Sequence, residues 1–329
     1  MKIMKKIIIT DYVNNPNIEK DIFGEDFQII CLNEEDECNF SDEICDADGI
    51  LVWHAKISEK TLKRLNKCKI IVKYGTGYDN VDFHACFKFG IPFCNTPDYG
   101  VEEVSDTACA FILGFIRQIY FYNEMCKGIT NGWQGHSEIP LLRTSDHRLG
   151  IIGMGRMGTT VALRMKAFGM NVGFYDPYVV SGYEKAIGVQ KFNSINELLK
   201  FSSIITIHTP LTENTSGMIN DEFIDQLNPG TILVNTARGK LVKNLDVLMR
   251  GLELNKISFL GLDVTPDEPP SNFEKLIEEW KNPKSSYFNR ILINPHSAYY
   301  STKAWYEMRS KCAENANNVI NGESPKNLI

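Results

Sequence analysis

The sequence has no Cys-x-x-Cys pair, although it contains nine cysteines in 329 residues. Disulfide frameworks and structural zinc sites show closely paired cysteines, so both classes are disfavoured. Cysteines 31, 38 and 45 are spaced by seven, but no histidine lies among them to complete a metal site. We therefore expect reduced thiols, no metal and a cytoplasmic location.

Long apolar runs and an excess of basic residues are also missing. No run approaches the roughly 18 residues that a membrane helix needs. The sequence contains 35 Lys and Arg residues and 41 Asp and Glu residues, which gives a net charge of −6. Such a chain is a poor candidate for non-specific binding to nucleic acid or to an anionic membrane. The start of the chain lacks the long apolar segment of a secretory leader, so we expect no secretion.

No repeat, low-complexity segment or Pro/Gly/Ser-rich linker interrupts the chain, and its length is typical of two domains. The first part alternates short apolar runs with helical patterns, which predicts a small parallel sheet flanked by helices. Its predicted strands are 6–10, 27–31, 49–53, 69–74 and 91–95, with a helix over 59–67.

A second and larger set of strand and helix patterns follows a predicted long helix over 101–118. Strands are predicted at 148–152, 171–175, 204–208, 231–235, 259–263 and 290–294, and helices over 157–168, 243–255 and 302–321. This alternation predicts a doubly wound parallel sheet with helices on both faces. The predicted fold class is α/β, with two Rossmann-like domains.

A glycine fingerprint lies between a predicted strand and a predicted helix, at Gly153, Gly155 and Gly158. In a dinucleotide site the first glycine allows a tight turn and the second lets the backbone approach a pyrophosphate. The third lets the helix pack on the sheet, and the free N–H groups of the helix start hold the phosphates. The pattern alone is weak, but the flanking strand and helix are those that the motif requires.

Asp176 ends the next predicted strand, 23 residues after Gly153. A carboxylate at this place accepts hydrogen bonds from both ribose hydroxyls and repels a 2′-phosphate, which favours NAD over NADP. The alternative is that Asp176 is a turn residue before Pro177, where aspartate is common.

Arg238, Glu268 and His296 follow three later predicted strands, whose carboxyl ends meet at one edge of the sheet. Arginine clamps a carboxylate with two parallel hydrogen bonds. Histidine gives a proton to a carbonyl oxygen, and a neighbouring carboxylate favours imidazolium and holds the ring. Each residue alone is more often a surface, loop or structural residue. Together, behind a dinucleotide fingerprint, they indicate reduction of a 2-oxo acid.

A glycine-rich loop, Gly75-Thr76-Gly77, follows a strand of the first part. Its free backbone N–H groups are a natural cradle for a second oxyanion. The alternative is a structural turn in which Asp79 and Asn80 cap the next helix, and both roles are compatible.

Taken in order, these motifs resemble the D-isomer-specific 2-hydroxyacid dehydrogenases over nearly the whole chain. The matching segments are the glycine loop to Asp82, 94–97, the Gly153 fingerprint, 176–177, 208–211, 235–239, 263–264 with 268–269, and 295–296. Segments 101–107, 174–178 and 296–301 are most similar to the branch that includes the C-terminal binding proteins.

The resemblance implies a homodimer. It also implies that each chain has a flavodoxin-like, split substrate domain (1–97 and 297–329) and an NAD-binding Rossmann domain (98–296). A cleft between the two domains would close on ligand. The resemblance also implies that Arg238 holds the carboxylate, that His296 is the acid/base and that Glu268 orients it. The implied cofactor contacts are Gly153, Gly155, Arg156, Met157, Gly158, Asp176, Thr209, Pro210, Thr236, Ala237, Asp263, His296 and Ala298. The implied substrate contacts are His54, Lys73, Tyr74, Gly75, Thr76, Gly77, Tyr99 and Tyr299.

The substrate shell is aromatic, and Trp53-His54-Ala55-Lys56 stands where several relatives with phosphorylated substrates carry arginine. This favours a medium, partly apolar 2-oxo acid over 3-phosphohydroxypyruvate, although Trp53 and Tyr74 are equally well explained as core residues. The main prediction is an NAD-dependent enzyme that interconverts a 2-oxo acid and a D-2-hydroxy acid. Alternatives are an NADH-responsive binding or scaffold protein, a phosphoglycerate dehydrogenase-type enzyme and, disfavoured by Asp176, an NADP-dependent reductase.

Overall fold

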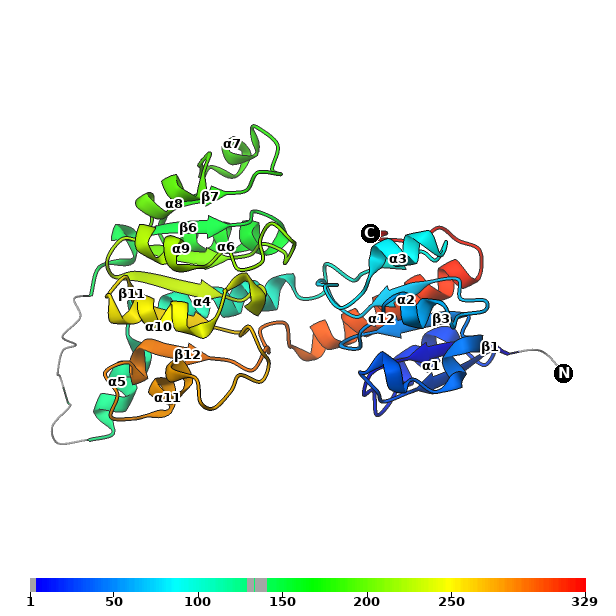
Figure 1. Cartoon of the computed structure of the whole chain (residues 1–329). Helices are drawn as coiled ribbons and strands as arrows, with labels where there is room; N and C mark the ends of the chain where they lie inside the picture. The colour runs from blue at the N-terminus through cyan, green and yellow to red at the C-terminus, as the bar shows by residue number, and fades with distance from the viewer. Residues whose placement is uncertain (1–3, 129–132, 134–140) are drawn as a thin grey trace. The chain divides into compact units, whose positions relative to one another are not determined.

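The computed structural model describes residues 4–128, 133 and 141–329. The chain divides into two compact units (Figure 1), which we call the terminal unit (Met1–Gly100 with Tyr300–Ile329) and the central unit (Val101–Tyr299). The sequence placed the domain boundaries after residues 97 and 296, and the contact units divide after residues 100 and 299.

The terminal unit contains a five-stranded parallel sheet in the order β2-β1-β3-β4-β5. The strands are β1 Lys5–Ile9, β2 Phe27–Cys31, β3 Gly49–Val52, β4 Ile71–Lys73 and β5 Phe93–Cys94. The helices are α1 Asn17–Phe23, α2 Glu59–Leu62, α3 Phe83–Lys88 and α12 Thr302–Ile320, with short 3₁₀ turns at Glu37–Asn39 and Asp42–Asp46. This strand order is that of flavodoxin-like sheets.

Two apolar clusters cover the two faces of this sheet. One cluster joins Ile7 and Val72 of the sheet to Met308 and Cys312 of α12. The other packs Ile50 of β3 under residues near α2 and α3. The terminal unit therefore needs both ends of the chain to cover its sheet.

The central unit contains a seven-stranded parallel sheet in the order β12-β11-β10-β9-β6-β7-β8. Its strands are β6 Arg148–Ile152, β7 Asn171–Tyr175, β8 Gln190–Lys191, β9 Ile204–Ile207, β10 Thr231–Asn235, β11 Ile257–Leu262 and β12 Ile291–Ile293. All residues of β9 and β10 are buried, as expected for parallel strands covered on both faces.

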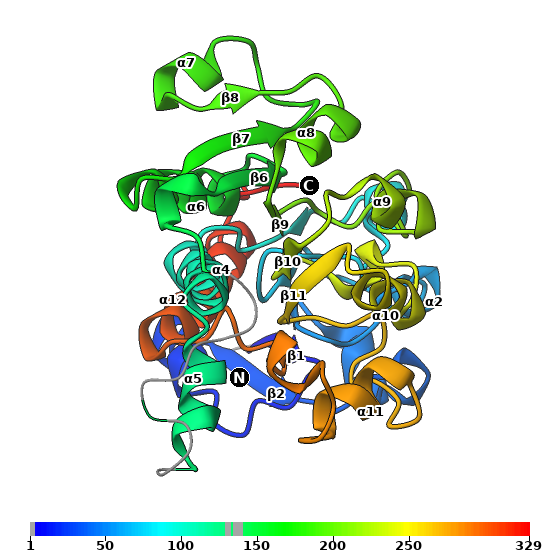
Figure 2. The same ribbon diagram turned by 90° about the vertical axis from the view of Figure 1, so that its left-hand side faces the viewer.

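Helices lie on both faces of the central sheet, and Figure 2 shows α4 and α6 on one side with α9 and α10 on the other. The helices are α4 Val101–Ile116, α5 Ile119–Cys126, α6 Arg156–Ala167, α7 Tyr183–Ile187, α8 Ile195–Phe201, α9 Asp221–Gln226, α10 Leu245–Glu253 and α11 Lys275–Lys281, with 3₁₀ turns at Thr144–Asp146, Gly239–Leu241 and Phe288–Arg290. The predicted α/β class with two parallel, Rossmann-like sheets is confirmed.

Two predicted helices differ from the structure, and one short strand was missed. The helix expected over 59–67 ends at Leu62, because the Asn66 N–H bonds the Cys45 carbonyl instead of the preceding helical turn. The helix expected over 101–118 is α4 and ends at Ile116, because Gln118 takes a left-handed conformation (φ 49°), and α5 after it was not predicted. Strand β8 was not predicted, because two residues are too short to show a period.

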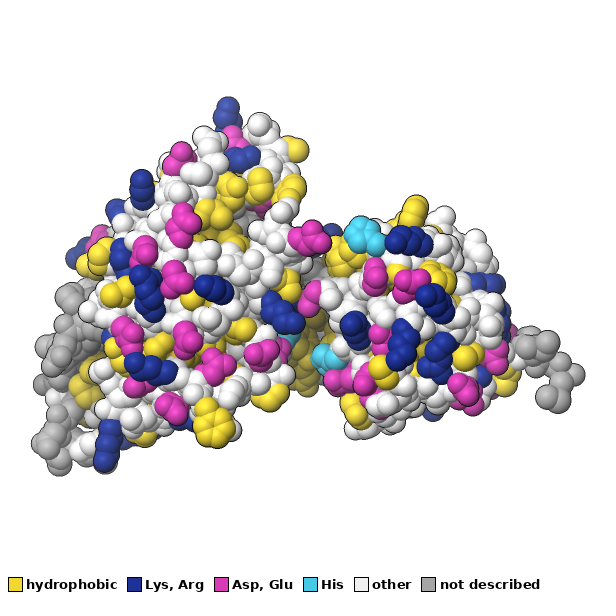
Figure 3. Space-filling view, in the orientation of Figure 1, with side chains coloured by type: hydrophobic (Ala, Val, Ile, Leu, Met, Phe, Trp, Pro, Cys, Tyr) yellow, Lys and Arg dark blue, Asp and Glu magenta, His cyan; other side chains and the backbone are white. Residues whose placement is uncertain are grey.

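Across the described part of the chain, every helix is too short or too polar to cross a membrane. On the face shown in Figure 3, acidic and basic side chains interleave over both units. The surface charge therefore agrees with the balanced composition.

Candidate active site

The order of the central sheet reverses between β6 and β9, where ligands bind in doubly wound folds. The fingerprint turn begins here, at Gly153 directly after β6. The His208 N–H, after β9, bonds the Ile152 carbonyl at 2.8 Å, and the Gly153 N–H bonds the Tyr175 carbonyl at 3.0 Å. The predicted cofactor loop thus lies at the topological switch point of the sheet.

The three fingerprint glycines occupy different environments. Gly153 has φ +91°, and an added Cβ would lie 2.7 Å from the carbonyl carbon of His208. A Cβ on Gly158 would lie 2.1 Å from the Gly153 carbonyl oxygen, so only glycine lets α6 pack this closely. A Cβ on Gly155 would meet nothing within 4 Å, which leaves open space where a pyrophosphate would approach.

An open hollow of about 640 Å³ lies beside this turn. It is lined by Met154, Gly155 and Arg156 at the start of α6, and by Tyr178 and Val179 after β7. The first N–H groups of a 12-residue helix such as α6 have no partner inside the helix and favour an anion. These residues fit the phosphates of a dinucleotide.

Asp176 connects the loops that follow β6 and β7. One carboxylate oxygen accepts the Met154 N–H at 2.8 Å, and the other accepts the Tyr178 N–H at 2.9 Å. Asp176 therefore has the turn role that was its alternative interpretation. The same two bonds hold its carboxylate beside the fingerprint, where the predicted ribose contact requires it.

The predicted nicotinamide side contains a buried polar atom that lacks a partner. The Thr236 hydroxyl oxygen, after β10, has no hydrogen bond, although the residue is only 6% exposed. Buried hydroxyls are normally satisfied, so this orphaned group fits a missing ligand. Ala237 is next to it, and Thr209 with Pro210 follows His208 after β9. Burial lowers the pKa of His208 to about 4, so this imidazole is neutral at neutral pH.

His296 and Glu268 form a pair in the central unit. Nδ1 of His296 lies 2.8 Å from Oε2 of Glu268, and both side chains are about 40% exposed. The Thr265 N–H donates to the other Glu268 oxygen at 3.2 Å. Because an ionised carboxylate only accepts, Nδ1 carries the hydrogen, and Nε2 is the nitrogen that exchanges a proton.

Asp263 holds the turn that carries His296. Its backbone carbonyl accepts the His296 N–H at 2.8 Å, and its Oδ1 accepts the N–H groups of Ser297 and Ala298 at 3.0 Å each. His296 itself has φ +52°, an uncommon conformation for a residue with a side chain. The predicted residues Asp263, His296 and Ala298 are thus joined by direct bonds.

Arg238 lies in a turn that packs against the Glu268 turn. A Cβ on Gly239 would lie 1.8 Å from the Thr265 carbonyl oxygen, so the two turns touch where Gly239 lacks a side chain. The buried Asn235 closes the Arg238 turn, donating to the Arg238 carbonyl at 2.9 Å and accepting the Ala237 N–H at 3.0 Å. Asn235 and Thr265 were not predicted as site residues, although both lie in the polar segments at the strand ends.

The charges of this cluster act on one another. Burial raises the pKa of Glu268, but the hydrogen bond and the charge of His296, together with Arg238, outweigh it and hold that pKa below its ordinary value. Burial raises the pKa of Asp263 despite its two backbone donors. Arg238, Glu268 and His296 therefore interact electrostatically. Tyr299 lies edge-on to His296, with ring centroids 6.4 Å apart.

The glycine loop of the terminal unit follows β4. Gly75 has φ +111°, and an added Cβ would lie 3.5 Å from the Tyr99 hydroxyl. The Gly75 carbonyl accepts the Thr96 N–H at 3.0 Å, and the Thr76 carbonyl accepts the Asn95 side chain at 2.8 Å. Gly75, Thr76 and Gly77 thus form an anchored turn with Tyr99 against it.

Two residues before this loop are buried. The Tyr74 ring lies in the core, and its hydroxyl donates to the buried Glu19 at 2.8 Å. The Tyr74 side chain is therefore a core residue, as the alternative interpretation held. Only the Tyr74 backbone is available to contact a substrate. The ammonium group of Lys73 donates to the Trp53 carbonyl. His54, in contrast, is exposed.

Comparisons with known proteins agree with this geometry. Residues 109–298 match the family described as D-isomer specific 2-hydroxyacid dehydrogenase, NAD binding domain. C-terminal-binding protein 1 of Caenorhabditis elegans is 30% identical over 288 residues, 86% of this chain and 38% of that protein. D-3-phosphoglycerate dehydrogenase of Methanocaldococcus jannaschii is 30% identical over 328 residues, 99% of this chain and 59% of that protein. The chain thus spans less than two thirds of either relative.

A solved structure covers both units. D-lactate dehydrogenase from Aquifex aeolicus, crystallised with NAD and lactic acid, has a TM-score of 0.83 and 29% identity. The match covers 97% of this chain and 96% of that one. The resemblance predicted from the motifs, including similarity to the C-terminal binding proteins, is confirmed, and the cofactor is NAD(H). The chain belongs to the D-isomer specific 2-hydroxyacid dehydrogenase family.

Proposed function

We propose that the protein is an NAD-dependent oxidoreductase that interconverts a 2-oxo acid and a D-2-hydroxy acid at the CH–OH group. The observation that carries the proposal is the 2.8 Å contact between His296 Nδ1 and Glu268 Oε2, with Arg238 close enough to lower the Glu268 pKa. These groups lie at the carboxyl edge of the NAD-binding sheet, where its ligands bind.

In the proposed reaction each residue has one task. Arg238 holds the substrate carboxylate with paired hydrogen bonds. NADH, when bound, supplies the hydride. Protonated His296 donates its Nε2 proton to the carbonyl oxygen, and in the reverse direction neutral His296 accepts the hydroxyl proton at Nε2. Glu268 keeps the ring oriented through Nδ1 in both directions.

The cofactor contacts are proposed from the residues around the fingerprint. The backbone at Gly155, Arg156 and Met157 would hold the phosphates and Asp176 the ribose, with Thr209 and Pro210 on the adenosine half. Thr236, Ala237 and Asp263 would face the nicotinamide side. The unpartnered Thr236 hydroxyl and the open space at Gly155 support this assignment.

The terminal unit is proposed to be the substrate domain. Its contacts would be the backbone of Gly75, Thr76 and Gly77, with Tyr99 and His54. In the central unit, Tyr299, edge-on to His296, is proposed as a substrate contact. The aromatic character of this set supports a medium, partly apolar 2-oxo acid. We also predict a homodimer and a cytoplasmic location. Light scattering after size-exclusion chromatography measures the molar mass and therefore checks the oligomeric state.

The test is NADH oxidation at 340 nm with 2-oxo acids from glyoxylate through branched and aromatic acids to 3-phosphohydroxypyruvate. We expect turnover that His296→Ala abolishes. Arg238→Ala should raise KM and lower kcat/KM about 100-fold, since a tenfold change corresponds to roughly 1.4 kcal/mol and a bond to a charged group to about 1.5–3 kcal/mol. Arg250→Ala, on the exposed side of α10, is the control. An unchanged kcat/KM in Arg238→Ala would refute its role.

A second candidate, raised by the sequence, is a protein whose binding of a partner responds to NADH, and one relative is a C-terminal-binding protein. Tight NADH binding without turnover of any acid, together with a partner gained or released on adding NADH, would favour it. Preferred turnover of 3-phosphohydroxypyruvate would instead favour a phosphoglycerate dehydrogenase-type enzyme, in keeping with the second relative.

A further inference from the structure

Cys38 is the one exposed cysteine among the nine, all of which lie in the described part of the chain. Burial raises the pKa of Cys68 and of Cys86 to about 12, so those thiols are poor nucleophiles at neutral pH. Cys38 lies in the 3₁₀ turn Glu37–Asn39, which follows β2 in the terminal unit. Its sulfur is therefore open to small reagents in solution.

An amine contacts this thiol. The Nζ of Lys60, on α2, lies 2.9 Å from the Sγ of Cys38, and both side chains are exposed. An ammonium group has donors but no acceptor, so it donates to the sulfur. Among the residues that the structure describes, Lys60 forms no ion pair with a carboxylate, and the thiol is the partner of its ammonium group.

The buried carboxylate of Glu37 fixes the two segments against each other. It accepts the Ser58 N–H at 2.9 Å, the Ser58 hydroxyl at 2.5 Å and the Thr61 hydroxyl at 2.6 Å. Ser58 is the N-cap of α2, and Cys38 directly follows Glu37. Because Lys60 lies between Ser58 and Thr61 in the sequence, these bonds place the amine beside the thiol.

Two further contacts join the same segments, one on each side of the thiol and the amine. The Lys56 N–H bonds the Glu35 carbonyl at 3.3 Å, and the Arg64 guanidinium donates to the Phe40 carbonyl at 2.8 Å. Groups that are held together in this way react with each other at a high effective concentration. The geometry therefore favours a reaction between the two side chains over a reaction with a second molecule.

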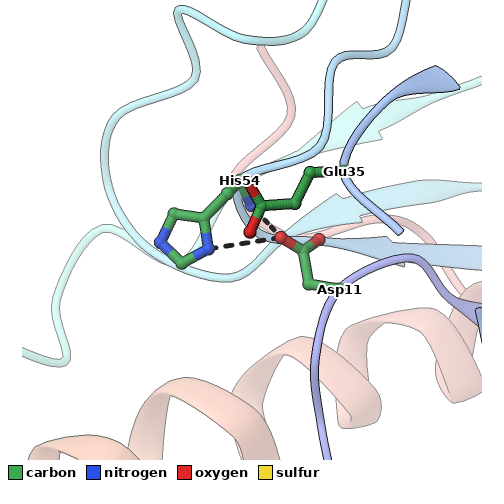
Figure 4. A group of neighbouring side chains, drawn as sticks. All are labelled: Asp11, Glu35 and His54. Carbon is green, nitrogen blue, oxygen red and sulfur yellow. Dashed lines mark hydrogen bonds and ion pairs between the residues drawn. The ribbon is translucent and has the colours of Figure 1, made fainter. Parts of the chain in front are cut away.

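The Glu35 side chain lies at the strand ends of the same unit. Figure 4 shows it beside Asp11, which follows β1, and His54, which follows β3. One side-chain oxygen or nitrogen atom of each residue lies within 4.8 Å of those of the other two. Asp11 also accepts the N–H groups of Trp53 and Ala55 at 2.7 and 3.2 Å. The segment that leads to the 3₁₀ turn therefore starts from a fixed edge of the sheet.

We propose that the thiol of Cys38 and the amine of Lys60 form a covalent sulfenamide when a hydroperoxide oxidises the sulfur. In the first step Sγ attacks an oxygen atom of hydrogen peroxide. The S–O bond forms, the O–O bond breaks and water leaves, so the sulfur is oxidised to sulfenic acid and the peroxide is reduced. In the second step the neutral Nζ attacks Sγ. The S–N bond forms, the S–O bond breaks, and the hydroxyl group leaves with the amine proton as another water.

The contact between the two groups favours this order of steps. In the reduced protein the hydrogen bond and the charge of Cys38 raise the pKa of the Lys60 ammonium group, which keeps the amine protonated. Oxidation of the sulfur removes that charge, so the amine loses its proton more easily after the first step. The sulfenamide then shields the sulfur from irreversible oxidation to sulfinic acid, and thiols such as dithiothreitol reduce it to the free thiol and amine.

The test is peptide mapping by mass spectrometry of the reduced, full-length protein before and after treatment with hydrogen peroxide. In the wild type we expect the peptides that carry Cys38 and Lys60 to be joined with the loss of two hydrogens, and dithiothreitol to separate them. Lys60→Arg retains the positive charge, but a guanidinium group is not deprotonated and cannot capture the sulfur. In this variant the link should be absent, and the share of thiol that dithiothreitol recovers should fall at least about fivefold as Cys38 advances to sulfinic acid.

Lys63→Arg is the matched control, because Lys63 is an exposed lysine of the same segment whose partner is Glu59 at 3.0 Å. It should form the link as the wild type does. A Cys38 that peroxide leaves unmodified, oxidation of Cys38 without the link, a disulfide in its place, or equal recovery of the thiol in Lys60→Arg would each overturn the inference. The dehydrogenase proposal does not depend on these outcomes, because neither side chain is assigned to that reaction.

Discussion

His296 and Glu268 show how one contact sets the chemistry of an imidazole. The carboxylate receives Nδ1–H, so the ring can accept or donate a proton only at Nε2. A glutamine at position 268 could donate to Nδ1 and stabilise the other tautomer. The pair therefore depends on the charge of Glu268 as well as on its position.

For Glu268→Gln we expect kcat to fall by roughly 10²–10⁴-fold, because a wrongly protonated imidazole cannot serve as the acid/base. KM for the 2-oxo acid should change little, since Arg238 still holds its carboxylate. Steady-state kinetics measure both constants. Asp267→Asn, which removes the neighbouring exposed charge, is the control, and equal losses in the two variants would contradict the assigned role.

Asp11 makes a prediction on stability. Asp11→Asn leaves a buried amide facing backbone N–H donors, so we expect a loss of about 2–3 kcal/mol in the free energy of unfolding at pH 7. Because the folded pKa is lowered, the contribution of the carboxylate is complete above its unfolded value of 3.8 and disappears as pH falls through the folded value.

Urea unfolding at pH 7 and at about pH 3 measures this effect. The gap between wild type and Asp11→Asn should narrow at the lower pH. Asp21→Asn, an exposed position on α1, should leave stability within about 0.5 kcal/mol of wild type at both pH values. A gap that widens on acidification would show that Asp11 is not ionised in the folded state.

At the scale of elements, two glycines at the start of α6, Gly155 and Gly158, have different roles. Gly158 lies against the Gly153 carbonyl, so Gly158→Ala should push α6 from β6 and lower stability by about 1–3 kcal/mol. Gly155 has open space around it, so Gly155→Ala should fold normally and weaken NADH binding instead. Thermal unfolding and NADH fluorescence titration distinguish the two. Equal destabilisation by both substitutions would contradict this division.

Much of this architecture could be predicted from the sequence, because long apolar strands and the fingerprint have strong local signals. β6, β7 and β10 begin and end at the predicted residues. The extent of α2 depends on a bond from Asn66 to the distant Cys45, and such tertiary contacts have no local pattern.

The candidate site shows the same limit. Arg238, Glu268 and His296 were predicted from their places at strand ends. Asn235 and Thr265 were missed, because their role is to bond the backbone of a turn, and many asparagines and threonines do so. For Tyr74, the sequence explained a core role and a substrate contact equally well, and only its burial and its bond to Glu19 in the structure decide between them.

For the whole molecule, the two units should respond differently to the cofactor. Saturating NADH should slow backbone hydrogen exchange in residues 153–158 and 208–210 of the central unit, where the proposed contacts lie. Strands β1 and β3 of the terminal unit serve as the internal reference, because no cofactor contact is proposed there. Slower exchange in β1 and β3 without slower exchange in the fingerprint residues would contradict the proposed cofactor site in the central unit.

The terminal unit is assembled from both ends of the chain, and this has a consequence for biosynthesis. Met308 and Cys312 of α12 cover its sheet, and the Ile329 N–H bonds the Phe93 carbonyl. On the ribosome, the first hundred residues emerge early but lack this cover until translation reaches α12. The central unit is continuous and is able to fold in the meantime. Nascent chains stalled before residue 302 should therefore expose the strands of the terminal unit to chaperones.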